Sequence, residues 1–193
     1  MNYKNFILAF FTSAAIVSVP ATSYAARPSY DYLQATYLRQ DLDDFDCTQT
    51  GLELAGSISV DESMFVQASM NDVSDAPCGS QLFRVSAGLR GDYGTQSNLF
   101  MKASLFNLNI DTPDDSGLGY GIAAGVRSYI NSGVELNGTI TYDNVDIDGV
   151  DLGLGFGVGI VYGLSNGLAV TGDLTYAEEN DVMGTNIGIR YYF

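Results

Sequence analysis

Apolar and polar residues alternate with a period of two along most of the chain after residue 30. Residues 151–162 show this clearly, because every second residue is aliphatic or aromatic and glycines fill most positions between them. A period of two indicates a β-strand, whereas an amphipathic helix repeats about every 3.6 residues. The alternation predicts ten strands of roughly ten residues each. They lie at residues 30–40, 49–60, 64–73, 81–91, 98–108, 118–130, 133–143, 151–163, 167–177 and 182–193.

The connections between these segments also alternate. Short turns are expected at residues 61–63, 92–97, 131–133 and 164–166, and longer acidic loops at residues 41–48, 72–80, 109–117, 144–150 and 178–181. Residues 51–58 and 133–140 share a Gly-aliphatic-Glu-Leu start, so the repeating unit is a hairpin. This arrangement indicates a meander with both ends on the short-turn side and no internal domain boundary.

A soluble barrel and a membrane barrel share this alternation but place the apolar face on opposite sides. Here one face is almost continuously aliphatic or aromatic, and the other carries small polar residues with scattered charges. Aromatic residues gather in two predicted belts. One contains Tyr30, Tyr32, Tyr129, Tyr162, Tyr191, Tyr192 and Phe193, and the other Tyr37, Tyr120, Tyr142 and Tyr176. We therefore predict an all-β fold, a transmembrane antiparallel up-and-down β-barrel of ten strands, with eight strands as the alternative.

Composition excludes several function classes. The chain has 193 residues, of which 23 are acidic and 8 basic, and its net charge is −15. No nucleic-acid partner is expected, because such partners require a basic face. The chain has no histidine, which removes Ser–His and Cys–His nucleophilic sites. Only carboxylate chemistry at Asp43/Asp44 or Asp114/Asp115 stays open, and we expect no enzyme and no cofactor.

The first 25 residues have the layout of a secretory signal peptide. Lys4 precedes an uncharged, largely apolar run that ends at Pro20, and Ser23 and Ala25 supply the small residues of a cleavage site. A short membrane anchor is the alternative, but the run falls short of the ~20 apolar residues that span a bilayer. The predicted parts are a signal peptide at residues 1–25 and a barrel domain at residues 26–193.

These features, with the final Arg-Tyr-Tyr-Phe of residues 190–193, resemble small Gram-negative outer-membrane β-barrel proteins, the porin-like and OmpA/OmpX-like group. The resemblance implies export to the outer membrane of a Gram-negative bacterium. It also implies outer-membrane lipid, lipopolysaccharide and the outer-membrane assembly machinery as partners of a monomeric barrel. Tyr191 and Phe193 match the C-terminal signal that the assembly machinery reads.

Two cysteines flank the second and third predicted strands. Cys47 precedes the second strand and Cys78 follows the third, and Glu62 lies midway between them. A hairpin that turns near Glu62 brings both cysteines together at its outer end. We predict a disulfide between them that ties two exposed loops, which the exported location permits. Two free thiols are the alternative.

Eight charged residues on the polar face are expected to line the lumen. They are Glu53, Arg84, Arg90, Lys102, Arg127, Glu135, Asp173 and Arg190. Arg90, Arg127 and Arg190 each follow a Gly-x pair near the end of a segment, which predicts a basic tier near the short-turn mouth. The three acidic residues are then available to the deeper Arg84 and Lys102. The pattern fits a narrow pore with an anion bias, or a small barrel filled by salt bridges.

The longer loops concentrate aspartate and glutamate. These loops are interpreted as a solvated surface, with loop-bound divalent cations as the alternative. The sequence thus predicts a structural or narrow-pore, porin-like role in the cell envelope. A surface-interaction, adhesion or host-contact protein is the alternative.

Overall fold

Ten antiparallel strands close into a barrel in the computed structural model, which describes residues 27–42, 47–75, 78–111 and 115–193. The expected signal peptide at residues 1–25 and the acids Asp43, Asp44, Asp46 and Asp114 lie outside these residues. The strands are β1 Tyr32–Leu42, β2 Cys47–Ser59, β3 Met64–Asp75, β4 Cys78–Tyr93, β5 Ser97–Ile110, β6 Asp115–Asn131, β7 Val134–Val145, β8 Gly153–Ser165, β9 Leu168–Ala177 and β10 Val182–Tyr192. The prediction of ten strands is confirmed, and the alternative of eight strands is wrong.

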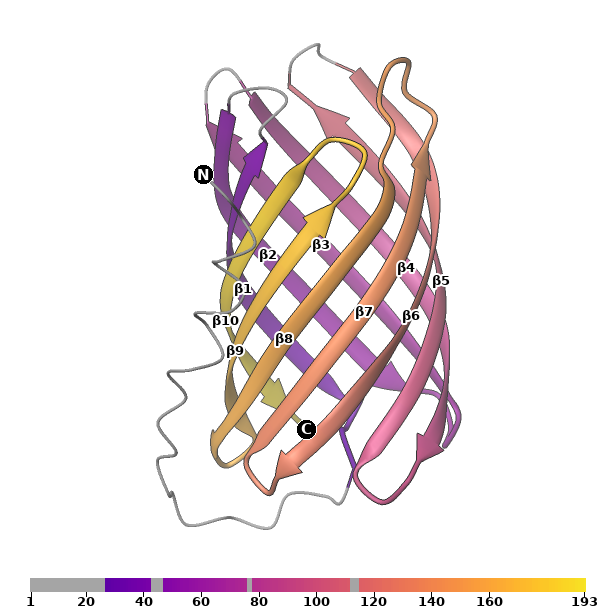
Figure 1. The fold of residues 1–193 in the computed structure, drawn as a ribbon, viewed down its shortest axis with the longest axis vertical. Helices are drawn as coiled ribbons and strands as arrows, with labels where there is room; N and C mark the ends of the chain where they lie inside the picture. The colour runs from indigo at the N-terminus through magenta and orange to yellow at the C-terminus, as the bar shows by residue number, and fades with distance from the viewer. Residues whose placement is uncertain (1–26, 43–46, 76–77, 112–114) are drawn as a thin grey trace.

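Each strand pairs with its neighbours in the sequence, and β1 pairs with β10 to close the sheet. In the closing pair Tyr32 lies opposite Tyr192 and Thr36 opposite Gly188. The strands are tilted, and the turns after β6 and β8 lie with the C-terminus at the lower end of Figure 1. We call this the short-turn end and the opposite one the long-loop end. No helix in the described parts of the chain is long and apolar enough to cross a membrane.

The outer face of the barrel is apolar over most of its height. Leu105 is 72% exposed, Leu118 74% and Val158 58%, although all three are aliphatic. A water-soluble protein rarely exposes such a continuous apolar surface. Glycine, serine, threonine and charged residues point inward, so the barrel has the inverted arrangement of a membrane-spanning barrel.

A charge placed on this outer band should therefore destabilise the barrel. We expect Val158→Arg, near the middle of β8, to lower the free energy of unfolding in lipid vesicles by about 2–4 kcal/mol, the cost of an arginine near the bilayer midplane. Val158→Leu, a similar apolar side chain, is the control and should change little. Urea titration of vesicle-embedded protein measures both. Equal stability of the arginine variant and the native chain would contradict a lipid-facing Val158.

The prediction of a lipid-facing aromatic belt at the short-turn end is correct only in part. Tyr191 and Phe193 are exposed on the outer face. Tyr30 and Tyr32 are instead buried inside the barrel, and Tyr192 packs edge-on against Tyr32. The sequence carried a signal for this, because Tyr32 has the parity of the polar Gln34 and Thr36, and Tyr192 has that of Arg190. At the long-loop end Tyr37, Tyr120, Tyr142 and Tyr176 are exposed, as expected.

An apolar cluster fills one side of the lumen toward the long-loop end. It contains Phe106, Leu108, Val145 and Ile147, with Leu82, Ile110, Val150 and Leu152 packed around it. Gly119 of β6 makes room for it, since a Cβ at Gly119 would collide with the Phe106 ring. The connection between β7 and β8, expected to be a solvated acidic loop, thus contributes apolar residues to the interior.

Candidate functional site within the lumen

The most buried ion pair lies near the short-turn end, between β6 and β7. Arg127 Nε and Nη2 donate to the two carboxylate oxygens of Glu135 at 2.7 and 3.0 Å. Glu135 is only 1% exposed. This two-bond geometry fixes the guanidinium plane. The third donor, Arg127 Nη1, reaches the backbone carbonyl oxygen of Ser29 at 2.8 Å, so the pair also holds the chain that precedes β1.

Tyr30 occupies the centre of this end of the barrel. Its ring lies 4.5 Å from the Phe65 ring centroid and 6.4 Å from that of Phe100. The guanidinium carbons of Arg127 and Arg90 lie 4.5 and 4.8 Å from the Tyr30 ring centroid. Two aromatic rings and two cations therefore enclose one side chain, through ring packing and cation–π attraction.

The third arginine of this tier joins through two further tyrosines. Arg190 Nε donates to Gln34 Oε1 at 2.7 Å, and Arg190 Nη1 donates to the Tyr192 hydroxyl at 3.1 Å. Its guanidinium carbon also lies 4.3 Å from the Tyr32 ring centroid. Arg127 faces the same ring at 5.9 Å. The structure thus places Arg90, Arg127 and Arg190 at one height, linked by tyrosine rings.

Arg90 connects this tier to the β2–β3 turn. Its Nε donates to the Glu62 carbonyl oxygen at 3.0 Å, and its Nη2 to the Asp61 carbonyl oxygen at 3.2 Å. The Asp61 side chain accepts backbone N–H bonds from Ser63 and Met64 at 2.6 and 2.7 Å. These bonds, led by that from Ser63, lower the pKa of the Asp61 carboxyl below its ordinary value. The ionised carboxylate therefore stabilises the turn, and this contribution is lost as the pH falls through the lowered pKa.

A second ion pair lies along the inner surface of the barrel wall, nearer the long-loop end. Arg84 of β4 donates from Nη1 and Nη2 to both carboxylate oxygens of Asp143 on β7, at 2.8 and 3.0 Å. Its guanidinium carbon lies 4.5 Å from the Phe106 ring centroid. The pair spans two intervening strands over Gly121, where a Cβ would collide with Asp143. Asp143 was expected to flank an acidic loop. Glu135, one of three acids expected to be available to Arg84 and Lys102, instead pairs with Arg127.

Between the two ion pairs lies a polar middle layer. Lys102 Nζ donates to Gln67 Oε1 at 2.9 Å, and Gln67 Nε2 donates to the Tyr32 hydroxyl at 3.4 Å. Glu53 and Asp173 face the same interior on β2 and β9. Gln67 was not among the residues expected in the lumen, although its polar side chain shares the parity of Phe65 on β3.

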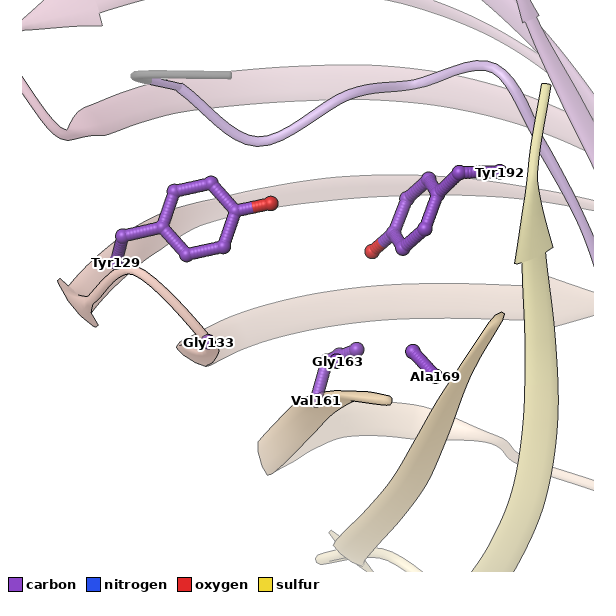
Figure 2. Close-up of a pocket in the computed structure, with 6 residues that line it drawn as sticks. All are labelled: Tyr129, Gly133, Val161, Gly163, Ala169 and Tyr192. Carbon is purple, nitrogen blue, oxygen red and sulfur yellow. The ribbon is translucent and has the colours of Figure 1, made fainter. Parts of the chain in front are cut away.

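A small cavity adjoins the tier of Arg90, Arg127 and Arg190 and the tyrosine rings that link them. Tyr129 and Tyr192 point toward each other across it, above Val161, Gly163 and Ala169 of the wall (Figure 2). The cavity measures about 10 Å³, which is room for about one water molecule. The short-turn end therefore has no space for a larger solute beside these two rings.

The same β8–β9 wall is closely packed at most inward positions above this tier. Glycines occupy the inward positions of β8. A Cβ added at Gly155 would collide with Thr141 and one at Gly159 with Asp173, whereas a Cβ at Gly157 would meet only ordinary contacts, with Thr175 Cγ2 at 3.7 Å and Leu174 O at 3.9 Å. Thr175 is exposed although its side chain lies inside the barrel beside Gly184. Thr175 lies two residues from the long-loop end of β9, so solvent reaches this wall from the long-loop mouth.

The predicted disulfide is present. Cys47 at the start of β2 is bonded to Cys78 at the start of β4, with a Cα–Cα distance of 6.7 Å and a sequence separation of 31. The bond spans β3 at the long-loop end, which confirms the pairing predicted from the hairpin.

The acidic loops form no recognisable cation site in the part of the chain that the structure describes. No group of three or more Cys, Asp or Glu residues there could hold a metal ion. Arg39 pairs with Asp41 at 3.2 Å at the end of β1. Loop-bound divalent cations therefore stay a prediction from sequence alone.

Comparison with known proteins identifies the fold. No protein-family model matches the chain, and no curated protein matches it. Among solved structures, an outer-membrane channel from Pseudomonas putida F1 is 11% identical, with a TM-score of 0.53 over 91% of this chain and 100% of that one. The KdgM porin, solved with disordered oligogalacturonate, is 8% identical, with a TM-score of 0.50 over 84% and 99%. The NanC porin is 9% identical, with a TM-score of 0.50 over 83% and 100%. With its apolar exterior and charged interior, the chain has the fold of a porin-like outer-membrane β-barrel.

Proposed function

We propose that this protein is an exported outer-membrane barrel with a structural role in the envelope and a lumen that does not conduct in the conformation described here. The chain would reach the outer membrane after removal of residues 1–25, with Tyr191 and Phe193 as its assembly signal. Both residues lie on the outer face with Ile187 and Ile189, where another protein can contact them before lipid does.

The filled short-turn end carries this proposal. Arg127 and Glu135 are buried together, and Tyr30, 3% exposed, lies between Phe65 and Phe100. Barrels of eight strands are just filled by side chains, and much larger ones leave an aqueous channel. Ten strands lie between these cases, and here the aromatic residues of one tier occupy the space that a pore would need.

Bilayer recording tests the proposal. Refolded protein inserted into a planar bilayer in concentrated potassium chloride should show no steady conductance steps. Insertion itself must be demonstrated, by protection of the barrel from protease in vesicles made under the same conditions. Steady, long-lived steps from the inserted native chain would overturn the non-conducting assignment.

A further inference from the structure

The chain before β1 enters the lumen instead of leaving the barrel. Arg27 forms an ion pair with Asp92 at the end of β4. At the other end of the segment, the Asp31 carboxylate accepts bonds from Ser59 N at 2.6 Å and Ser59 Oγ at 3.1 Å. Residues 27–31 are thus attached to β4 at one end and to β2 at the other, and they cross the short-turn mouth between them.

The middle of this segment fills the mouth. The Ser29 carbonyl oxygen accepts a bond from Arg127, and Pro28 and Tyr30 are buried. The Tyr30 ring separates Arg90 from Arg127, since both guanidinium groups face it. Tyr30, which fills the centre of the tier, therefore belongs to a segment that is not part of the barrel wall.

The attachment of the segment is lighter than that of a strand. Residues 27–31 belong to no strand, so they can leave without breaking a ladder of backbone hydrogen bonds. The Arg27–Asp92 pair is about half exposed on both sides, and such exposed pairs contribute little. The wall, in contrast, is a closed sheet in which every strand has two partners.

We propose that residues 27–31 are an internal plug and that their withdrawal opens the lumen to small anions. The inference rests on the proposed function, in which the plugged barrel is silent. Withdrawal removes the Tyr30 ring from between Arg90 and Arg127 and leaves these two cations and Arg190 at the mouth, with Glu135 as the opposing charge. Rings of basic side chains favour anions. At the opposite mouth, solvent already reaches Thr175 near the long-loop end of β9.

The test compares two substitutions at one position. Tyr30→Ala removes the ring from the tier, and Tyr30→Phe keeps the ring and its contacts with Phe65 and Phe100. In planar bilayers with potassium chloride, Tyr30→Ala should spend at least about tenfold more time in conducting steps than the native chain, whereas Tyr30→Phe should stay silent. Across a potassium chloride gradient, the reversal potential of Tyr30→Ala should have the sign of chloride selectivity.

A second variant covers the case in which Tyr30→Ala does not fold. The double variant Arg27→Ala/Asp31→Ala releases both ends of the segment and keeps every ring and guanidinium of the tier. It should open more often than the native chain. Folding is verified for each protein by circular dichroism and by heat-dependent mobility on gels. A folded, inserted Tyr30→Ala that is silent, or a silent double variant if only that one folds, would overturn the plug. Conductance of the native chain would overturn the proposed function instead.

Discussion

Removing the carboxylate of Glu135 is expected to destabilise the barrel more than any other single change considered. Glu135→Ala leaves the Arg127 guanidinium buried without its partner, because both carboxylate bonds are lost. Loss of one member of a buried pair costs about 3–5 kcal/mol, since the remaining charge has lost its compensation. Urea unfolding of vesicle-embedded protein, followed by tyrosine fluorescence, measures the change in the free energy of unfolding.

Two further variants separate this effect from a general loss of packing. Glu178→Ala removes an exposed carboxylate and should change the free energy of unfolding by about 0.5 kcal/mol or less. The double variant Arg127→Met/Glu135→Leu removes both charges and should be more stable than Glu135→Ala, because no charge stays uncompensated. A loss below about 1 kcal/mol for Glu135→Ala would show that water solvates Arg127. The tier would then be hydrated and not sealed.

Loss of the disulfide is expected to have the next largest effect. The bond between Cys47 and Cys78 closes a loop with a sequence separation of 31. On the chain-entropy account, such a loop corresponds to about 3–4 kcal/mol of stability, because the bond restricts the unfolded chain. Cys47→Ser/Cys78→Ser should therefore unfold at a lower urea concentration than the oxidised native protein.

Reduction of the native protein is the matched comparison for this variant. The reduced native chain should unfold at the same urea concentration as the double serine variant. Reductant should not change the urea concentration at which the variant unfolds. Mass spectrometry after alkylation without reduction should detect no reactive thiol in the native chain. Identical unfolding curves for the oxidised and reduced native protein would contradict a stabilising role for the bond.

The strands and their faces were available from sequence because both depend on local order. A side chain two positions along a strand lies on the same face, so the outward position of Val158 and the inward position of Arg190 follow from alternation. The disulfide was equally accessible, since the hairpin between β2 and β3 makes Cys47 and Cys78 meet at one end. Parity alone would have placed Tyr32 and Tyr192 inside, but their aromatic character led to the wrong prediction of a lipid-facing belt.

The partners within the lumen depended on the closed barrel. Arg84 reaches Asp143 over β5 and β6, and Lys102 reaches Gln67 over β4. Alternation assigns a face but carries no information about contacts between non-adjacent strands, which depend on barrel curvature, strand tilt and the space left by glycines such as Gly121. Glu135 was expected among three acids available to Arg84 and Lys102, but it pairs with Arg127 of the adjacent strand β6, close to the register shift between Tyr129 and Asn131.

The sequence by itself determined a ten-stranded membrane barrel, its lipid-facing band, its charged interior and its disulfide, because each follows from a period of two and the order of hairpins. Only the tertiary structure decided that residues 27–31 turn into the short-turn mouth and that Tyr30 lies between two arginines. That segment has no periodicity of its own, and its position depends on Phe65 of β3, Phe100 of β5 and Arg127 of β6, which face one another across the interior of the curved barrel.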